Sequence, residues 1–192
     1  MAKFAGKINT AVFISGRGSN LKNLVKFSKK KFSPIKIILV VTNNKNAKGL
    51  NFAKNKNIPF LVNNFKNKII SENKLIKKIK KNKIELICLA GFMKILTNNF
   101  IKKYNQPILN IHPSLLPKYK GLNTHQRVIN NNEKFTGSTV HLVNSKLDSG
   151  KIILQRKIKI LKNDNPKTLE KKILKLEHKL YPDAILKFLT NF

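Results

Sequence analysis

Short apolar runs alternate with segments of helical spacing through most of this chain. Residues 35–42 form a nearly continuous apolar run, which is typical of strands that are covered on both faces. Residues 72–81 instead carry their apolar side chains three and four positions apart, which indicates an amphipathic helix. Because strands that alternate with helices form parallel sheets, the pattern predicts an α/β fold.

The same reading divides the chain into further elements, and their order changes towards the C-terminus. The predicted strands are residues 8–15, 35–42, 59–62, 85–92 and 108–112, and the predicted helices are 21–30, 47–56, 72–81, 98–104 and 124–131. Residues 136–143 and 152–160 are both strand-like and follow each other, so we expect an antiparallel hairpin. Residues 166–189 predict a long final helix, which Pro182 could interrupt.

These elements predict a single domain over residues 1–192, with a mostly parallel, twisted sheet and helices on both faces. A late antiparallel hairpin and a C-terminal helix complete the predicted fold. A chain of 192 residues with 41% hydrophobic residues is long enough to bury one core. No repeat and no linker divides it.

Composition bears on the cellular compartment of the protein. No apolar run reaches the ~20 residues that span a membrane, and the N-terminus lacks the apolar core of a signal peptide. The single cysteine, Cys88, lies in an apolar run, which favours a buried structural thiol over a nucleophile and excludes an internal disulfide. We therefore expect a cytoplasmic protein without membrane contact.

The formal net charge of +32 raises the question of nucleic-acid binding. Only Arg17, Arg127 and Arg156 are arginines, whereas the other 37 basic residues are lysines spread along the whole chain. Specific readers of nucleic acid depend on the planar fork of arginine. The charge therefore indicates a general drift in composition and an attraction for anionic substrates, and we expect no specific nucleic-acid partner.

A glycine-rich turn follows the first predicted strand. Residues 16–20 read Gly-Arg-Gly-Ser-Asn and open a helix, where free backbone amides can hold a phosphate. Leu21 stands where the third glycine of a dinucleotide-binding motif would be, and the segment is not a Walker A motif either. Ser19 or Asn20 could also serve as the N-cap of the helix, and both readings can hold at once.

The most informative segment begins at the end of the fifth predicted strand. Asn110 and His112 are two residues apart, so an extended strand points both side chains to one face, and Pro113 ends the strand. An amide that stabilises an oxyanion beside an imidazole that moves a proton is suited to acyl transfer. An isolated pair of this kind is more often a polar contact at a loop.

The segment Asn-Ile-His-Pro-Ser-Leu-Leu-Pro at residues 110–117 resembles the signature of the folate-dependent formyltransferase family. Residues 15–20, 89–96 and 147–150 agree with this family in order and spacing, and the similarity extends from about residue 8 to about residue 182. Within the family, the chain is similar to the enzymes of purine synthesis that formylate glycinamide ribonucleotide. The resemblance implies a Rossmann-like formyltransferase fold and formyl transfer from 10-formyltetrahydrofolate to 5-phosphoribosyl-glycinamide.

The resemblance also implies roles for individual residues. It implies catalysis by Asn110, His112 and Asp148, phosphate binding by Gly18, Ser19 and Asn20, ribose binding by Glu177, and folate binding by Lys68, Met93, Lys94, Ile95, Leu96 and Asn110. The aspartate would sit beside the histidine, where a carboxylate raises the pKa of the imidazole and keeps it protonated. The formyl folate would be a co-substrate, with no other cofactor and no metal.

Several readings stay open beside these roles. The family often has arginine where this chain has Lys68 and Lys94, and lysine lacks the planar fork. Asp148 could simply cap a turn in which Gly150 has a positive φ, and Glu177 could be a surface acid that pairs with lysine. His141 could support the site or only pack in its strand.

Three further alternatives concern the whole protein. A hydrolase of formyl folate and a methionyl-tRNA formyltransferase share the Asn-x-His motif, but each normally has an additional domain for which this chain lacks room. A basic nucleic-acid-binding protein on a degenerate enzyme fold is supported by the charge alone. We expect small-molecule substrates and a monomer or weak homodimer.

Overall fold

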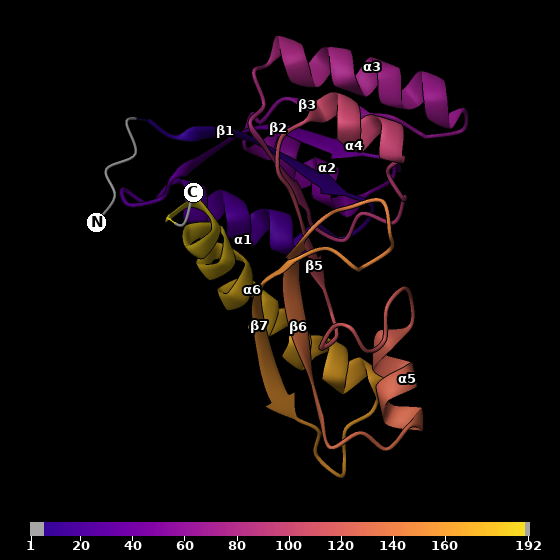
Figure 1. Cartoon of the computed structure of the whole chain (residues 1–192). Helices are drawn as coiled ribbons and strands as arrows, with labels where there is room; N and C mark the ends of the chain where they lie inside the picture. The colour runs from indigo at the N-terminus through magenta and orange to yellow at the C-terminus, as the bar shows by residue number, and fades with distance from the viewer. Residues whose placement is uncertain (1–5, 191–192) are drawn as a thin grey trace. The chain divides into compact units, whose positions relative to one another are not determined.

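The structure, a computed structural model, describes residues 6–190, and this part of the chain forms seven strands and six helices (Figure 1). In chain order the elements are β1 (Ile8–Ile14), α1 (Ser19–Ser28), β2 (Ile35–Thr42), α2 (Lys48–Asn55), β3 (Phe60–Val62), α3 (Lys68–Lys81), β4 (Leu86–Leu89), α4 (Asn98–Tyr104), β5 (Ile108–His112), α5 (Thr124–Asn130), β6 (Phe135–Leu142), β7 (Ile152–Lys159) and α6 (Pro166–Thr190). The predicted α/β fold with a late hairpin and a C-terminal helix is confirmed.

The strands have the order β3-β2-β1-β4-β5-β6-β7. β1 pairs in parallel with β2 and β4, and β2 pairs in parallel with β3, whereas β6 and β7 are antiparallel. The chain folds as two compact units, residues 1–109 and 110–192, so that β5 begins in the first and ends in the second. Each unit is described by itself.

The core of the first unit lies on both faces of β1. Ala11, Val12, Phe13 and Ile14 are completely buried, and all four residues of β4 are buried too. Unbroken apolar runs form these strands because neither face meets water. Helix α1 contributes one apolar face, on which Leu21 and Leu24 are also completely buried.

Side-chain caps set where helices of the first unit begin. The Asn67 side chain accepts a hydrogen bond from the amide of Ile70, so α3 starts at Lys68, earlier than the sequence pattern predicts. Thr97 caps α4 in the same way, and the buried carboxylate of Glu72 accepts hydrogen bonds from both the amide and the hydroxyl of Thr97. α1 is different, because its N-cap is Gly18 in the left-handed conformation, without a side-chain bond. The predicted capping by Ser19 or Asn20 is therefore wrong.

The second unit is built on the β6–β7 hairpin, and Figure 1 shows α6 in yellow alongside these two strands. Val128 of α5 packs with Leu169 and Ile173 of α6 in a small apolar cluster. The two strands approach closely at Gly137, where a Cβ atom would lie 2.0 Å from the carbonyl oxygen of Arg156.

Helix α6 continues without a break through Pro182, contrary to the expected interruption. Proline removes one backbone hydrogen bond, which usually kinks or ends a helix. Here Leu180, Tyr181, Ala184 and Ile185 are completely buried on both sides of the proline. The burial of these side chains stabilises the helix on both sides of the proline.

Two expectations from composition can be compared with the described residues. Cys88 is completely buried in β4, as predicted. Between residues 6 and 190, no helix has the length and apolar character that a membrane crossing needs.

Candidate active site

His112 ends β5 with its imidazole buried, and both ring nitrogens have an oxygen neighbour. Nε2 lies 2.8 Å from the carbonyl oxygen of Tyr119, so this nitrogen carries a proton and donates it. Nδ1 lies 3.4 Å from Oδ2 of Asp148. A proton on Nδ1 would complete an ion pair with this carboxylate, so both ring positions suit the imidazolium form.

Asp148 reaches the same place from the turn between β6 and β7. Only 7% of its side chain is exposed. Oδ2 accepts a hydrogen bond of 2.9 Å from the backbone amide of Gly121, and Oδ1 lies 3.5 Å from the side-chain amide nitrogen of Asn110. The carboxylate therefore contacts two residues that lie 27 and 38 positions before it in the sequence.

His141 is the fourth member of this cluster. Its Nδ1 donates to the carbonyl of Leu142 at 2.8 Å, and its Nε2 lies 3.1 Å from the side-chain amide nitrogen of Asn110. The same Nε2 lies 3.6 Å from Oδ1 of Asp148. Of the two readings that the sequence left open for His141, contact with the candidate site is the one observed, and the alternation along β6 places it there.

Burial has the largest effect on the pKa of His112. Removal from water lowers the pKa of His112 below its usual value, and electrostatic interaction with His141 and Arg127 lowers it further. The Tyr119 carbonyl and the Asp148 carboxylate act in the opposite direction and raise the pKa, but burial outweighs them. The expectation that the carboxylate keeps the imidazole protonated is therefore wrong for the free protein, although the sign of the Asp148 contribution is as expected.

Asp148 favours its charged form. Burial raises the pKa of its carboxyl group, but hydrogen bonds from the His141 side chain and the Gly121 amide, together with the charge of His112, bring the pKa below the usual value. An ionised carboxylate beside an imidazole with a lowered pKa is a pair that can accept and pass on a proton near neutral pH.

The turn that carries Asp148 differs from the prediction in one detail. Asp148 itself has a positive φ of 45°, whereas Gly150 does not. Glycine is required at 150 because a Cβ atom there would lie 1.7 Å from the carbonyl oxygen of Leu142. The glycine thus allows a close backbone contact, and the left-handed residue of the turn is the aspartate, a residue type that tolerates this conformation.

In the first unit, the glycine-rich turn lies between the N-termini of α1 and α2. The amide of Gly49 donates to the carbonyl of Gly16 at 3.0 Å. A Cβ atom on Gly18 would lie 2.7 Å from the Cα of Gly49, so glycine at both positions permits this approach. Ser19 opens α1 and Asn20 follows it. A glycine-rich turn at the N-terminus of a helix is suited to an anion.

Ser15 connects this turn to the segment after β4, which sequence reasoning did not foresee. Its hydroxyl donates to Oδ1 of Asn43 and accepts a hydrogen bond of 2.7 Å from the amide of Met93. Its own amide donates to the carbonyl of Gly91. Ser15, Asn43 and Gly91 all follow the ends of neighbouring parallel strands, and this common position is the only signal in the sequence that links them.

The predicted folate residues of the first unit differ in exposure. Met93 and Ile95 are 62% and 60% exposed, and Lys94 is exposed beside them. Leu96 is only 6% exposed, so its side chain belongs to the core. Lys68 is the exposed first residue of α3.

Glu177 is buried within α6, which excludes the reading as a surface acid. Only 6% of the residue is exposed, and Oε1 lies 3.5 Å from the hydroxyl of Ser138. The same hydroxyl donates to the carbonyl of His112 at 2.9 Å. The carboxylate is therefore one residue away from the backbone of the candidate site.

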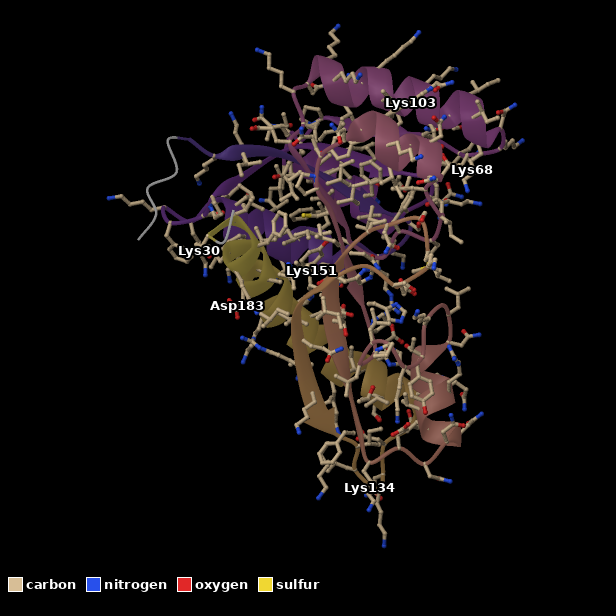
Figure 2. All side chains as sticks on the ribbon, in the orientation of Figure 1. Lys30, Lys68, Lys103, Lys134, Lys151 and Asp183 are labelled. Carbon is tan, nitrogen blue, oxygen red and sulfur yellow. The ribbon has the colours of Figure 1, made fainter. Side chains whose placement is uncertain are left out.

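Lysines are spread widely over the chain, as its composition indicates. Figure 2 shows Lys134 extending away from the ribbon at the turn before β6, and lysines project from every part of the chain. Within residues 6–190, no three His, Cys, Asp or Glu side chains are grouped so that they could hold a metal ion.

Comparisons with known proteins show the family to which the chain belongs. The family model described as formyl transferase matches residues 8–185. The phosphoribosylglycinamide formyltransferase of Haemophilus influenzae is 41% identical over 184 residues, which cover 94% of this chain and 86% of that protein. The crystal structure of phosphoribosylglycinamide formyltransferase from Brucella melitensis has a TM-score of 0.90 and 39% identity, covering 95% of both chains.

A longer relative is also similar. The trifunctional purine biosynthetic protein adenosine-3 of Bos taurus is 38% identical over 182 residues, which are 93% of this chain. The chain spans only 18% of the length of that relative.

Proposed function

We propose, from the premise that the chain belongs to the formyl transferase family, that it transfers a formyl group from 10-formyltetrahydrofolate to the amine of 5-phosphoribosyl-glycinamide. The products are formylglycinamide ribonucleotide and tetrahydrofolate, in the synthesis of purines. The observation that carries this proposal is the buried cluster in which Asn110, His112 and Asp148 meet.

The reaction needs an oxyanion site and a route for one proton. The amine attacks the formyl carbon, and the formyl oxygen becomes an oxyanion that the Asn110 amide stabilises by turning one N–H from its present partner. The amine nitrogen then loses a proton, and the departing folate nitrogen gains one. His112 and Asp148 carry this proton between the two nitrogens, so that the net proton count does not change.

Binding roles complete the proposal. Gly18, Ser19 and Asn20 bind the phosphate of the ribonucleotide, and Glu177 binds its ribose. Lys68, Met93, Lys94, Ile95, Leu96 and Asn110 surround the folate, with Leu96 contributing its backbone because its side chain is buried. The formyl folate is a co-substrate, and no further cofactor takes part.

The proposal extends to the whole protein. Residues 1–192 act as one formyltransferase domain in the cytoplasm, as a monomer or weak homodimer. The partners are small molecules, without a specific nucleic acid or a membrane.

A steady-state assay tests the function. Release of tetrahydrofolate is measured with and without phosphoribosyl-glycinamide for the wild type, His112→Ala, Asp148→Asn and the control Asp183→Asn. Asp183 lies in the same unit and pairs with Arg156 at a half-exposed position. The control therefore removes the same charge as Asp148→Asn, but away from the candidate site. We expect release to require the acceptor and kcat to fall about 10²–10⁴-fold in the first two variants only.

Other outcomes would assign another activity. Release without the acceptor would identify a hydrolase. A folded wild type that releases no folate would overturn the enzyme proposal, and tight, strongly salt-dependent binding to nucleic acid would then support the basic binding protein.

A further inference from the structure

One short segment of backbone holds both members of the His112–Asp148 pair. We call residues 119–123, between β5 and α5, the bridging segment. The carbonyl of Tyr119 accepts the Nε2 proton of His112 at 2.8 Å, and the amide of Gly121 donates to Asp148 at 2.9 Å. Any displacement of this segment therefore moves the imidazole and the carboxylate relative to each other.

The bridging segment has an unfavourable backbone conformation. Tyr119, Gly121 and Asn123 have φ values of 57°, 77° and 56°. Left-handed conformations are costly for residues with a Cβ atom, and they persist only where the surroundings impose them. The segment consequently depends on contacts outside itself to keep the shape in which it holds His112 and Asp148.

Arg127 of α5 supplies the most extensive of these contacts. Its Nη1 donates to the carbonyl of Lys120 at 2.6 Å and lies 3.5 Å from the carbonyl of Leu122. Its Cζ lies 5.3 Å from the centroid of the Tyr119 ring, within the range of a cation–π contact. The side chain thus contacts three of the five residues of the segment.

A second group of residues fixes the other end of the Tyr119 side chain. The phenol donates to Oε1 of Glu133 at 2.7 Å and accepts from the amide of Asn131 at 3.0 Å. Lys118 pairs with the same carboxylate oxygen at 3.1 Å. Because these bonds hold the Tyr119 hydroxyl, the ring that Arg127 contacts is fixed at its far end. Arg127 then restrains the ring and the carbonyls of Lys120 and Leu122 together.

The choice of arginine is informative in this chain, which uses lysine at 37 of its 40 basic positions. A lysine ammonium group is compact and could donate to the Lys120 carbonyl, whereas the extended guanidinium reaches this carbonyl, the Leu122 carbonyl and the Tyr119 ring together. The contacts of Arg127 therefore require a guanidinium, whereas a requirement for charge alone would be met by lysine.

We propose that Arg127 is a positioning residue, which holds the bridging segment so that Tyr119 and Gly121 keep His112 and Asp148 in their reactive arrangement. This inference rests on the proposed formyl transfer for its kinetic consequence, but not for its structural one. Arg127 does not touch the imidazole or the carboxylate, so it acts through the backbone of residues 119–123.

The test compares two substitutions with a matched control. Arg127→Lys keeps the charge and removes the planar group, and Arg127→Gln removes both. Arg156→Lys makes the same exchange at an arginine of the same unit that pairs with Asp183 and has no described contact with the bridging segment. Keeping the charge matters because the groups that act electrostatically on His112 are Asp148, His141 and Arg127 itself.

Two readouts are measured on the whole chain. The first is kcat and KM for formyl transfer. We expect kcat to fall about ten-fold in Arg127→Gln and at least about three-fold in Arg127→Lys, with little change in KM, because small misplacements of catalytic groups slow the chemical step. The second is the NMR signal of the His112 Nε2 proton, which we expect to exchange faster with water in both variants, while Arg156→Lys leaves both readouts unchanged.

The outcomes are distinguishable. Arg127→Lys with wild-type kcat and an unchanged Nε2 signal would overturn the proposal, as would a loss of thermal stability with unaltered kcat and signal. If the wild type itself transfers no formyl group, the proposed function fails, and the Nε2 signal still decides: faster exchange in both Arg127 variants supports the positioning role, and unchanged exchange overturns it.

Discussion

At the scale of single residues, burial and hydrogen bonding act in opposite directions on the two titratable groups of the candidate site. Burial lowers the pKa of His112 even though Asp148 raises it, whereas hydrogen bonds lower the pKa of Asp148 even though burial raises it. The free protein therefore holds an ionised carboxylate beside an imidazole that gives up its proton readily. Such a pair is ready to receive the proton of an attacking amine.

The titration of His112 follows from these contributions. We expect its NMR midpoint below the usual ~6.5, and lower still in Asp148→Asn, because the carboxylate is a contribution that raises the pKa. Asp164→Asn removes an equally ionised carboxylate that pairs with Lys172 and should leave the midpoint unchanged. A midpoint above 6.5, or one that rises in Asp148→Asn, would contradict this account.

The same shift fixes the direction of a pH effect on stability. Because the pKa of His112 is lower in the folded chain, the unfolded chain binds more protons between that value and ~6.5. The contribution of His112 to the free energy of unfolding is therefore fully present above ~6.5 and is lost as the pH falls through this window. The lowered pKa of Asp148 adds a further loss at more acidic pH, below ~3.9.

Some of these residue-level features could be predicted from the sequence, and others depend on tertiary packing. The spacing of Asn110 and His112 along a strand already places them on one face. The lowered pKa of His112 could not be predicted, because the burial that causes it comes from segments distant in the sequence. The role of Arg127 was equally hidden, since the rarity of arginine marks the residue but does not show which carbonyl groups it reaches.

At the scale of elements, the glycine-rich turn depends on how closely α1 and α2 approach. The sequence predicts that residues 16–20 form a turn before a helix, but it gives no sign that Gly49 at the start of α2 is the contact. This contact depends on two backbones meeting, and only the folded chain brings them together. The continuous α6 is a similar case, because buried side chains outweigh the local effect of Pro182.

A matched pair of substitutions in the turn measures this approach. Gly18→Ala places a Cβ atom 2.7 Å from the Cα of Gly49 at a φ of 71°, so we expect the free energy of unfolding to fall by about 2–4 kcal/mol. Gly16→Ala has nothing within 4 Å and should change it by less than about 1 kcal/mol. Chemical denaturation of both variants provides the measurement, and equal effects would show that the close approach is not what requires glycine.

At the scale of the whole molecule, a net charge of +32 is carried by a chain with only eight acidic residues. Several of these acids have specific tasks: Glu72 holds Thr97, Glu133 holds Tyr119, and Asp164 pairs with Lys172. Few carboxylates are thus left to balance the lysines spread over the surface. Repulsion among like charges opposes compact folding under these conditions.

Added salt should therefore stabilise the protein. Raising KCl from about 20 to 200 mM shortens the screening length to below ~10 Å, and we expect the free energy of unfolding to rise by about 1 kcal/mol, or roughly 2–4 °C in Tm. Glycerol at equal osmolality does not screen charge and serves as the control. A Tm that stays constant or falls with KCl would mean that the specific ion pairs contribute more than the general repulsion.

Because Cys88 is buried in β4, its reactivity reports local opening of this strand. This thiol is the only one in the protein, and it is completely buried in β4, which is hydrogen-bonded to β1. A thiol reagent can reach it only when β4 becomes accessible, so the rate of covalent labelling counts openings of the strand rather than collisions with the surface. Because no second thiol competes for the reagent, the lifetime of this closed state can be read without introducing a probe.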